Sequence, residues 1–414
     1  MEKLTANEIK KLSGGSPDAF RIVDSGFGRV RFETDLAGMY RALFSLRTAD
    51  RLLLEAASFP ALDFDGLFDG TRAVAWEDLV PKGMGLAVDK VRSNHSRLAS
   101  ETSIQAVVHK AAAGRLCERY REVSLPEAAA GNRADLRVYV EKDRVQILLD
   151  LCGKPLFKRG YRLEGGAAPL RESTAAALLL QALWRRKFPL YDPFCGSGTI
   201  VIEAALYAWD VAPGLGRGFT VSALPFAGTE TENEVRRTLF ERIDLSRNAE
   251  IFGSDSDGGS VETAKANLAR ALENVCGCED VFGGRRPAVM PKLWRRPMEE
   301  AVAPLGGGFI ITNPPYGVRL LDRENAETLY RDMGVLRDNF LSWKINILSA
   351  HPGFESLFGA SADRCKKITS GAFETYFYQY DCGGARKETV KRPGAAVAKM
   401  PAAPKKPGGK VYTW

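Results

Sequence analysis

A glycine-rich turn between an apolar strand and an apolar helix restricts the fold of this chain more than any other feature. The sequence Asp-Pro-Phe-Cys-Gly-Ser-Gly-Thr spans residues 192–199, between a strand expected at 189–193 and a helix expected at 199–209. Gly196 and Gly198 permit a sharp turn and let a ligand approach the backbone, while the free N–H groups of the first helical turn suit an acceptor-rich ligand. The order of strand, turn and helix predicts a nucleotide-type site at the edge of a sheet.

The turn does not have the spacing of a phosphate-binding loop. Neither GxGxxG nor GxxxxGK[ST] occurs in it. The carboxylate of Asp192 would repel phosphate groups and attract a cationic amine. A cofactor with an amine in place of a diphosphate is therefore favoured, and S-adenosyl-L-methionine fits.

The segments after residue 165 alternate between helix and strand with the rhythm of a parallel sheet. This predicts an α/β fold, a doubly wound Rossmann-like sheet that ends in an antiparallel hairpin, with an insertion at 210–247. The expected helices are 170–187, 199–209, 260–274 and 325–340, and the expected strands are 189–193, 251–254, 308–312, 344–349, 367–369 and 373–380.

Two acidic residues, Asp255 and Asp257, follow the second strand of this sheet. A carboxylate at this place commonly holds the ribose hydroxyls of an adenosine-containing ligand. Taken alone, the segment would be interpreted as a helix cap. Because it follows the glycine turn within one sheet, Asp255 is the candidate ribose ligand and Asp257 the alternate.

The segment Asn313-Pro314-Pro315-Tyr316 follows the apolar strand at 308–312. The exocyclic amine of a nucleobase is a poor nucleophile, because its lone pair is delocalised into the ring. The carbonyl oxygens of Asn313 and Pro314 could accept from its N–H groups and localise that pair, and Tyr316 offers a face for a flipped base. These residues are the predicted catalytic group.

The region before residue 165 has shorter segments, typical of an α+β fold. Its expected helices are 6–12, 35–46 and 102–121, and its expected strands are 20–23, 29–34, 52–58, 136–140 and 144–151. The segment after the last strand places three cations, Lys158, Arg159 and Arg162, around the aromatic Tyr161. We expect these four residues to contact RNA.

Composition and charge further narrow the class of protein. The net charge is +7, and basic residues mixed with Pro, Gly and Ala fill a tail at 383–414, which we expect to be disordered. The tail suits either of two uses, a solubilising segment or a basic arm that binds RNA. The seven cysteines lack CxxC pairing, so no metal is expected. There is no secretory signal and no membrane-length apolar run, so we expect a cytoplasmic protein.

Over about residues 1–382, the chain resembles the bacterial THUMP-domain 23S rRNA (guanine-N2)-methyltransferases. The segments that carry the resemblance, in family order, are 192–199, 200–205, 212–219, 253–257 and 313–320. The resemblance divides the chain into a ferredoxin-like subdomain (1–55), a THUMP RNA-binding domain (56–164), a methyltransferase domain (165–382) and the tail.

The family implies methyl transfer from S-adenosylmethionine to N2 of a guanosine in 23S rRNA. By motif, the cofactor residues would be Leu170, Asp192, Pro193, Cys195, Gly196, Ser197, Gly198, Thr199, Asp255, Asp257 and Asn313. A transfer RNA guanine methyltransferase is the nearest alternative; a DNA adenine methyltransferase and a non-catalytic RNA-binding protein are more distant.

The chain departs from the family pattern in two places. Many relatives have an acidic residue near the adenine, where this chain has 294–299 without a clear counterpart. Some relatives also carry a second methyltransferase domain, which is not found in this sequence. One activity is therefore expected.

Overall fold

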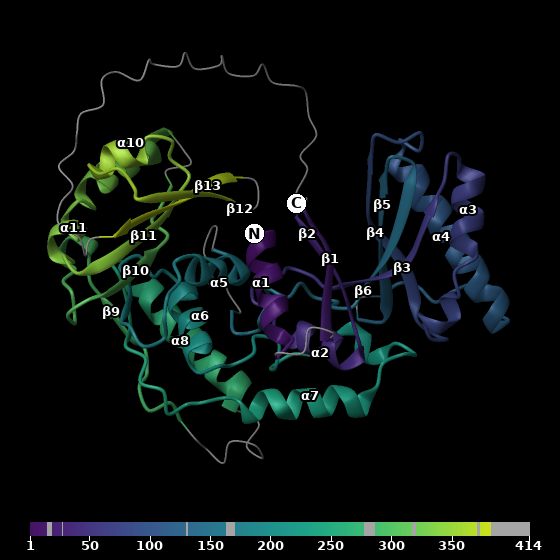
Figure 1. The fold of residues 1–414 in the computed structure, drawn as a ribbon, viewed down its shortest axis with the longest axis horizontal. Coiled ribbons are helices and arrows are strands. Elements are labelled where there is room, and N and C mark those ends of the chain that lie inside the picture. The colour runs from purple at the N-terminus through teal and green to yellow at the C-terminus, as the bar shows by residue number, and fades with distance from the viewer. Residues whose placement is uncertain are drawn as a thin grey trace.

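The computed structural model describes residues 1–14, 19–26, 28–129, 131–162, 170–276, 286–316, 320–370 and 373–381. Within these residues the strands form sheets of two, four and seven strands. In Figure 1 the seven-stranded sheet lies at the left and the four-stranded sheet at the right, with the first helices and the two-stranded sheet between them. None of the described helices is long and apolar enough to cross a membrane.

The seven-stranded sheet has the order β12-β13-β11-β10-β7-β8-β9. The five strands β7 to β11 pair in parallel, β13 adds antiparallel to β11, and β12 adds antiparallel to β13. The predicted α/β fold with a terminal antiparallel pair is confirmed. The strands are β7 (Leu190–Asp192), β8 (Ile251–Asp255), β9 (Lys292–Arg295), β10 (Gly308–Thr312), β11 (Trp343–Ser349), β12 (Arg364–Ser370) and β13 (Phe373–Asp381).

Because β8 and β10 flank β7 on opposite sides, the order of the strands reverses at β7. In open α/β sheets, ligands bind at the carboxyl ends of the strands beside such a reversal. The glycine turn follows β7 and the Asn-Pro-Pro-Tyr segment follows β10, so the topology brings the two predicted motifs to one edge.

The helices around this sheet differ from expectation mainly in their ends. The helix expected at 170–187 ends at Gln181, just before Leu183 turns into the left-handed region at φ 55°. The helix expected at 325–340 is divided at Gly334, a poor helix former. The helices are α5 (Glu172–Gln181), α6 (Thr199–Ala208), α7 (Thr229–Glu241), α8 (Gly258–Cys276), α10 (Leu320–Asp332), α11 (Val335–Asn339) and α12 (Phe354–Phe358), with short 3-10 turns η3 (Thr220–Ala223) and η4 (Met298–Glu300).

The N-terminal region contains a helical pair with a hairpin, and then the sheet β3-β6-β5-β4. Helices α3 and α4 contact this sheet through β3 and β4. The boundary expected at residue 55 falls inside β3, so the sheet begins just before it. The elements are α1 (Glu2–Leu12), β1 (Phe20–Gly26), β2 (Arg29–Thr34), α2 (Leu36–Ser45), β3 (Leu53–Pro60), α3 (Phe64–Arg72), η2 (Trp76–Asp78), β4 (Gly85–Asn94), α4 (Glu101–Tyr120), β5 (Arg133–Glu141) and β6 (Arg144–Asp150).

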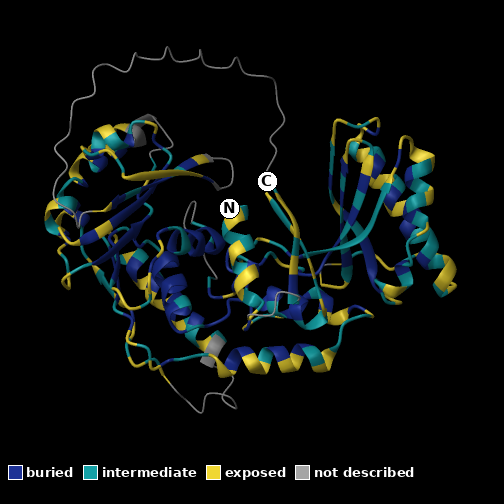
Figure 2. Ribbon diagram, in the orientation of Figure 1, coloured by how far each residue is buried: buried dark blue, intermediate teal, exposed yellow. Residues whose placement is uncertain are grey.

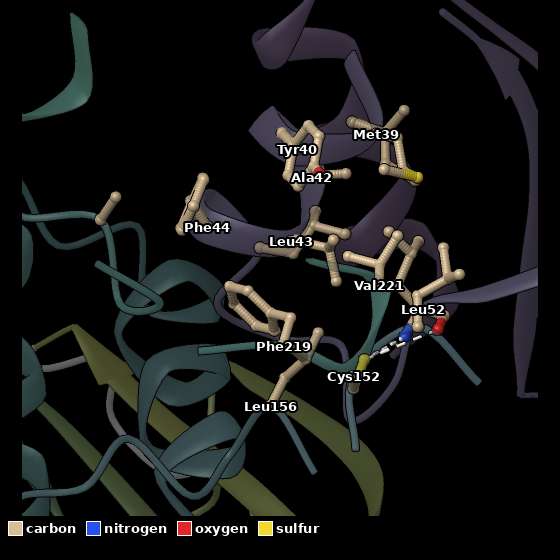
Figure 3. Packing of buried hydrophobic residues seen from close by; sticks show 14 of the residues in the cluster. Met39, Tyr40, Ala42, Leu43, Phe44, Leu52, Cys152, Leu156, Phe219 and Val221 are labelled. Atoms are coloured by element: carbon tan, nitrogen blue, oxygen red, sulfur yellow. Dashed lines mark hydrogen bonds between the residues drawn. The ribbon is translucent and has the colours of Figure 1, made fainter. Parts of the chain in front are cut away.

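One hydrophobic core runs from the N-terminal region into the seven-stranded sheet. Buried residues are concentrated on the central strands and on the helices that cover them (Figure 2). Figure 3 shows the side chains of α2 above Phe219 and Val221 of the insertion. The rings of Phe44 and Phe219 meet edge to face with centroids 5.4 Å apart. Their shared core joins two regions that the sequence alone had separated. The expected tail at 383–414 lies outside the described residues.

Candidate functional site

A cavity of about 400 Å³ lies at the carboxyl ends of β7 and β10. The glycine turn is among its walls, and so is Asn313, whereas Pro314, Pro315 and Tyr316 are not. The lining residues are Leu170, Asp192, Phe194, Cys195, Gly196, Ser197, Thr199, Ile200, Asp257, Gly259, Ser260, Thr263 and Asn313. Of the predicted cofactor residues, Pro193, Gly198 and Asp255 are not among the lining residues.

The glycine turn needs glycine at both positions for different reasons. Gly196 has φ 51° and an added Cβ would meet no atom within 4 Å, so the space beside it is open to a ligand. Gly198 has φ 86°, and its Cβ would come within 2.9 Å of the Ala264 methyl on α8. Helix α8 also holds the turn through Asn267, which donates to the Ser197 carbonyl at 2.9 Å. The turn is thus packed against one helix and open toward the cavity.

Asp192 is a buried carboxylate at the floor of this cavity, with 1% of its surface exposed. It accepts hydrogen bonds from the Thr312 hydroxyl at 2.6 Å and from the Phe194 N–H at 3.1 Å. Burial, with a smaller contribution from the nearby Asp255 carboxylate, raises the pKa of Asp192 to about 7. Thr312 is the last residue of β10, so this bond ties the end of β7 to the residue before Asn313.

The two acidic residues at the end of β8, Asp255 within the strand and Asp257 just after it, have different partners. Asp255 accepts from the Gly196 N–H at 2.9 Å and from the Asp257 N–H at 3.0 Å, directly behind the turn. Asp257 accepts from the Ser260 N–H at 2.9 Å and from its hydroxyl at 2.8 Å, which caps the start of α8. Asp257 is therefore a helix cap, and it also lines the cavity. The expected ribose contact stays a prediction for both.

The Asn-Pro-Pro-Tyr segment is held from two sides. The Tyr330 hydroxyl, on α10, donates to the Pro315 carbonyl at 2.8 Å. The Tyr316 hydroxyl donates to Asn313 Oδ1, the oxygen expected to accept from an amine. Burial raises the pKa of Tyr316 well above its usual range, so its phenol keeps the proton for this bond. A base would therefore share Asn313 Oδ1 with Tyr316 or displace its hydroxyl.

The structure corrects two of the four expected RNA contacts. Arg159 and Tyr161 are buried, with 4% and 1% of their surface exposed, so neither can reach an RNA phosphate. The Tyr161 hydroxyl donates to Glu203 on α6 at 3.1 Å, and Arg159 donates to the carbonyl of Arg47 at 2.6 Å. They hold the N-terminal region against the domain of the seven-stranded sheet.

The other two expected contacts differ from each other. Lys158 is exposed and remains a candidate for RNA. Arg162 is partly buried, and its guanidinium donates to the Leu170 carbonyl and the Thr199 hydroxyl. It faces the cavity wall rather than solvent.

Sequence reasoning missed the cavity wall formed by α8. Gly259, Ser260 and Thr263 lie on its first turns and line the cavity, together with Phe194 and Ile200 beside the glycine turn. The sequence could have indicated this wall, because in this fold a helix that follows a strand begins at the edge of the sheet where that strand ends. No cluster of metal-ligating side chains occurs among the described residues.

A larger cavity of about 1760 Å³ lies between the β1–β2 hairpin and the four-stranded sheet. Its charges are largely paired, as in the Arg31–Glu55 contact at 2.8 Å and the Arg137–Asp89 contact at 3.0 Å. The cavity therefore presents no simple surplus of positive charge.

Comparisons with known families agree with the resemblance seen in the sequence. The profile described as the RMKL-like methyltransferase domain matches residues 159–276 and 299–379. The profile described as the RlmL ferredoxin-like domain matches residues 1–53.

Relatives and solved structures cover nearly the whole chain. A "Putative RNA methyltransferase YpsC" of Bacillus subtilis is 34% identical over 85% of this chain and 88% of its own length. A "Ribosomal RNA large subunit methyltransferase K/L" of Syntrophotalea carbinolica is 32% identical over 96% of this chain, which spans only 54% of that relative. The crystal structure of SMU.472, a putative methyltransferase complexed with SAH, has TM-score 0.79 and 33% identity, covering 93% of this chain and 96% of that one.

Proposed function

Since the chain belongs to the family of RMKL-like methyltransferases, we propose that it methylates the exocyclic N2 of a guanosine in 23S rRNA. The cofactor is S-adenosylmethionine, which supplies the methyl group. The observation that carries the proposal is the cavity itself, because Asn313 and the glycine turn line one space. The names of the K/L relatives support large-subunit rRNA as the substrate.

The residues of the cavity fit an adenosyl ligand with an amino-acid end. Asp192 offers a buried carboxylate to an ammonium group, and its partners Thr312 and Phe194 donate to it without neutralising its charge. The open space beside Gly196 admits the ligand to the backbone. Asp257 borders the cavity and Asp255 the turn, where either carboxylate can accept from ribose hydroxyls.

On the base side, the chain supplies acceptors and position. Asn313 Oδ1 and the Pro314 carbonyl accept from the guanine amine, which localises the nitrogen lone pair toward the methyl group. Tyr316 provides a ring face, while its bond to Asn313 orients the amide. No strong base is needed, because the methylated amine is acidic and can pass its proton to water or through Asn313. Positioning supplies most of the rate.

The test is methyl transfer from tritium-labelled S-adenosylmethionine to separated rRNA and tRNA, followed by nucleoside analysis. We expect label in 23S rRNA, recovered as N2-methylguanosine. Label that appears only in tRNA, or only as N6-methyladenosine, would overturn the proposal and favour one of the alternatives.

A further inference from the structure

Arg162 connects the end of the N-terminal region to two walls of the cofactor cavity. Its Nη2 donates to the Thr199 hydroxyl at 2.7 Å and to the Leu170 carbonyl at 2.9 Å, and both of these residues line the cavity. Its side chain is only 12% exposed, and Glu172 Oε1 lies 3.7 Å away. The guanidinium is therefore fixed in place behind the cavity wall.

The bond from Arg162 determines what the Thr199 hydroxyl can do. An arginine only donates, so the Thr199 oxygen must accept from it. Within the described part of the chain, the hydroxyl hydrogen of Thr199 has no acceptor of its own. Thr199 is thus left as a donor at the cavity wall, and it is also the first residue of α6.

Three features at this wall favour a negatively charged group. Thr199 offers its hydroxyl hydrogen, the first turn of α6 offers free N–H groups, and Arg162 adds a positive charge behind them that Glu172, 3.7 Å away, partly balances. Asp192, which favours an ammonium group, lines the same cavity. A carboxylate and an ammonium together form the amino-acid end of S-adenosylmethionine.

We propose that Arg162 is a positioning residue for the carboxylate of the cofactor, acting through Thr199 and Leu170 rather than by direct contact. This inference rests on S-adenosylmethionine as the cofactor. It gives a function to a residue that the sequence had suggested as an RNA contact.

The docking of the whole segment supports this role. Tyr161 donates to Glu203, and Arg162 donates to Thr199, one helical turn earlier on the same face of α6. Arg270 of α8 holds the Tyr161 carbonyl from the other side at 2.9 Å. The segment is therefore clamped between two helices that both line the cofactor cavity, which fixes the guanidinium relative to Thr199.

The test compares two ligands by calorimetry. S-adenosylhomocysteine has the amino-acid end, and 5′-methylthioadenosine lacks it. In Arg162→Met we expect the Kd for S-adenosylhomocysteine to rise by about tenfold or more, because Thr199 is no longer held in position to donate to the carboxylate of the ligand. The Kd for 5′-methylthioadenosine should stay within about twofold of the wild-type value, since its contacts are unchanged.

Two further variants distinguish the loss of a positioning role from general damage to the cavity. Thr199→Val removes the hydroxyl at nearly the same volume and should weaken the binding of S-adenosylhomocysteine selectively, as Arg162→Met does. The double variant should bind this ligand little more weakly than either single variant. Arg236→Met is the matched control: Arg236 also bonds a carbonyl (Leu215) and a carboxylate (Glu232), away from the cavity lining, so both affinities should stay normal.

The outcomes distinguish this inference from the proposed function. If the wild-type protein binds S-adenosylhomocysteine and Arg162→Met binds it equally well, the inference is wrong and the cofactor assignment stands. An equal loss for both ligands would also overturn it, because the effect would then be a general collapse of the cavity. No binding by the wild-type protein would overturn both.

Discussion

At the scale of single residues, the buried carboxylate of Asp192 makes the ligand-free protein sensitive to pH. Its pKa of about 7 lies above the usual value of 3.8, because burial penalises the charged form. The shift stabilises the folded protein fully at pH values below the usual pKa of 3.8. This stabilisation decreases as the pH rises and is lost as the pH passes about 7. Raising the pH from about 6 to 8 should therefore lower the unfolding temperature of the ligand-free protein, and Asp192→Asn should remove most of this loss.

The same carboxylate predicts how cofactor affinity changes with pH. An ammonium group beside Asp192 favours its ionised form, so binding near pH 6 should release a proton. The affinity for S-adenosylhomocysteine should then increase from pH 6 to 8, by at most about tenfold per pH unit. Calorimetry in buffers with different ionisation enthalpies measures the released proton. An affinity that does not vary with pH would mean that the ammonium lies elsewhere.

The Tyr330 hydroxyl should matter for catalysis but not for the cofactor. It is the side-chain donor that fixes the Pro315 carbonyl, and it sits on α10, outside the residues lining the cavity. In Tyr330→Phe we expect kcat to fall roughly tenfold, because the acceptors for the amine lose their alignment. The Kd for S-adenosylhomocysteine should change by less than about twofold. A normal kcat would show that the segment holds its shape without this bond.

At the scale of elements, the glycine turn should tolerate alanine unequally at its two positions. Gly198→Ala should destabilise the protein by about 2 kcal/mol or more, because a φ of 86° is unfavourable for alanine and the added Cβ would also clash with Ala264. Gly196→Ala carries only the backbone cost, about 1 kcal/mol. Urea unfolding of both variants measures the difference. Equal losses would contradict the packing of α8 on the turn.

The elements that the sequence predicted well are those with a strong local signal. β7, β10 and β11 are apolar runs bounded by turns, and they lie within about two residues of expectation. β9 and β4 were not expected, because β9 has only four residues with basic ends and β4 mixes polar and apolar positions. α3 was not expected either, because the glycines at 66 and 70 lower the helix propensity of its segment.

At the scale of the whole molecule, the N-terminal region and the methyltransferase domain should unfold together. They share one core, and the side chains of Arg159 and Glu203, 3% and 0% exposed, lie 3.6 Å apart across their interface. Arg159→Met leaves Glu203 without this cation and should cost about 3 kcal/mol in urea unfolding. Its exposed neighbour provides the control, since Lys158→Met should stay within about 0.5 kcal/mol.

This interface also shows what the sequence could not reveal. A run of cations around one aromatic residue looks the same whether it contacts RNA or closes a buried interface. Its partners, Glu203 and Thr199, lie far along the chain, and only the fold brings them to Arg159, Tyr161 and Arg162. The cofactor turn was predictable because its residues are contiguous.

The most direct test of the central claim is the turnover of Asn313→Ala on 23S rRNA, measured beside its affinity for S-adenosylhomocysteine. Asn313 lines the cavity, and in the proposed function it is the side-chain acceptor for the amine. We predict that methyl transfer falls by at least about 100-fold while the affinity changes only a few-fold. Near-normal methyl transfer by Asn313→Ala would contradict the account.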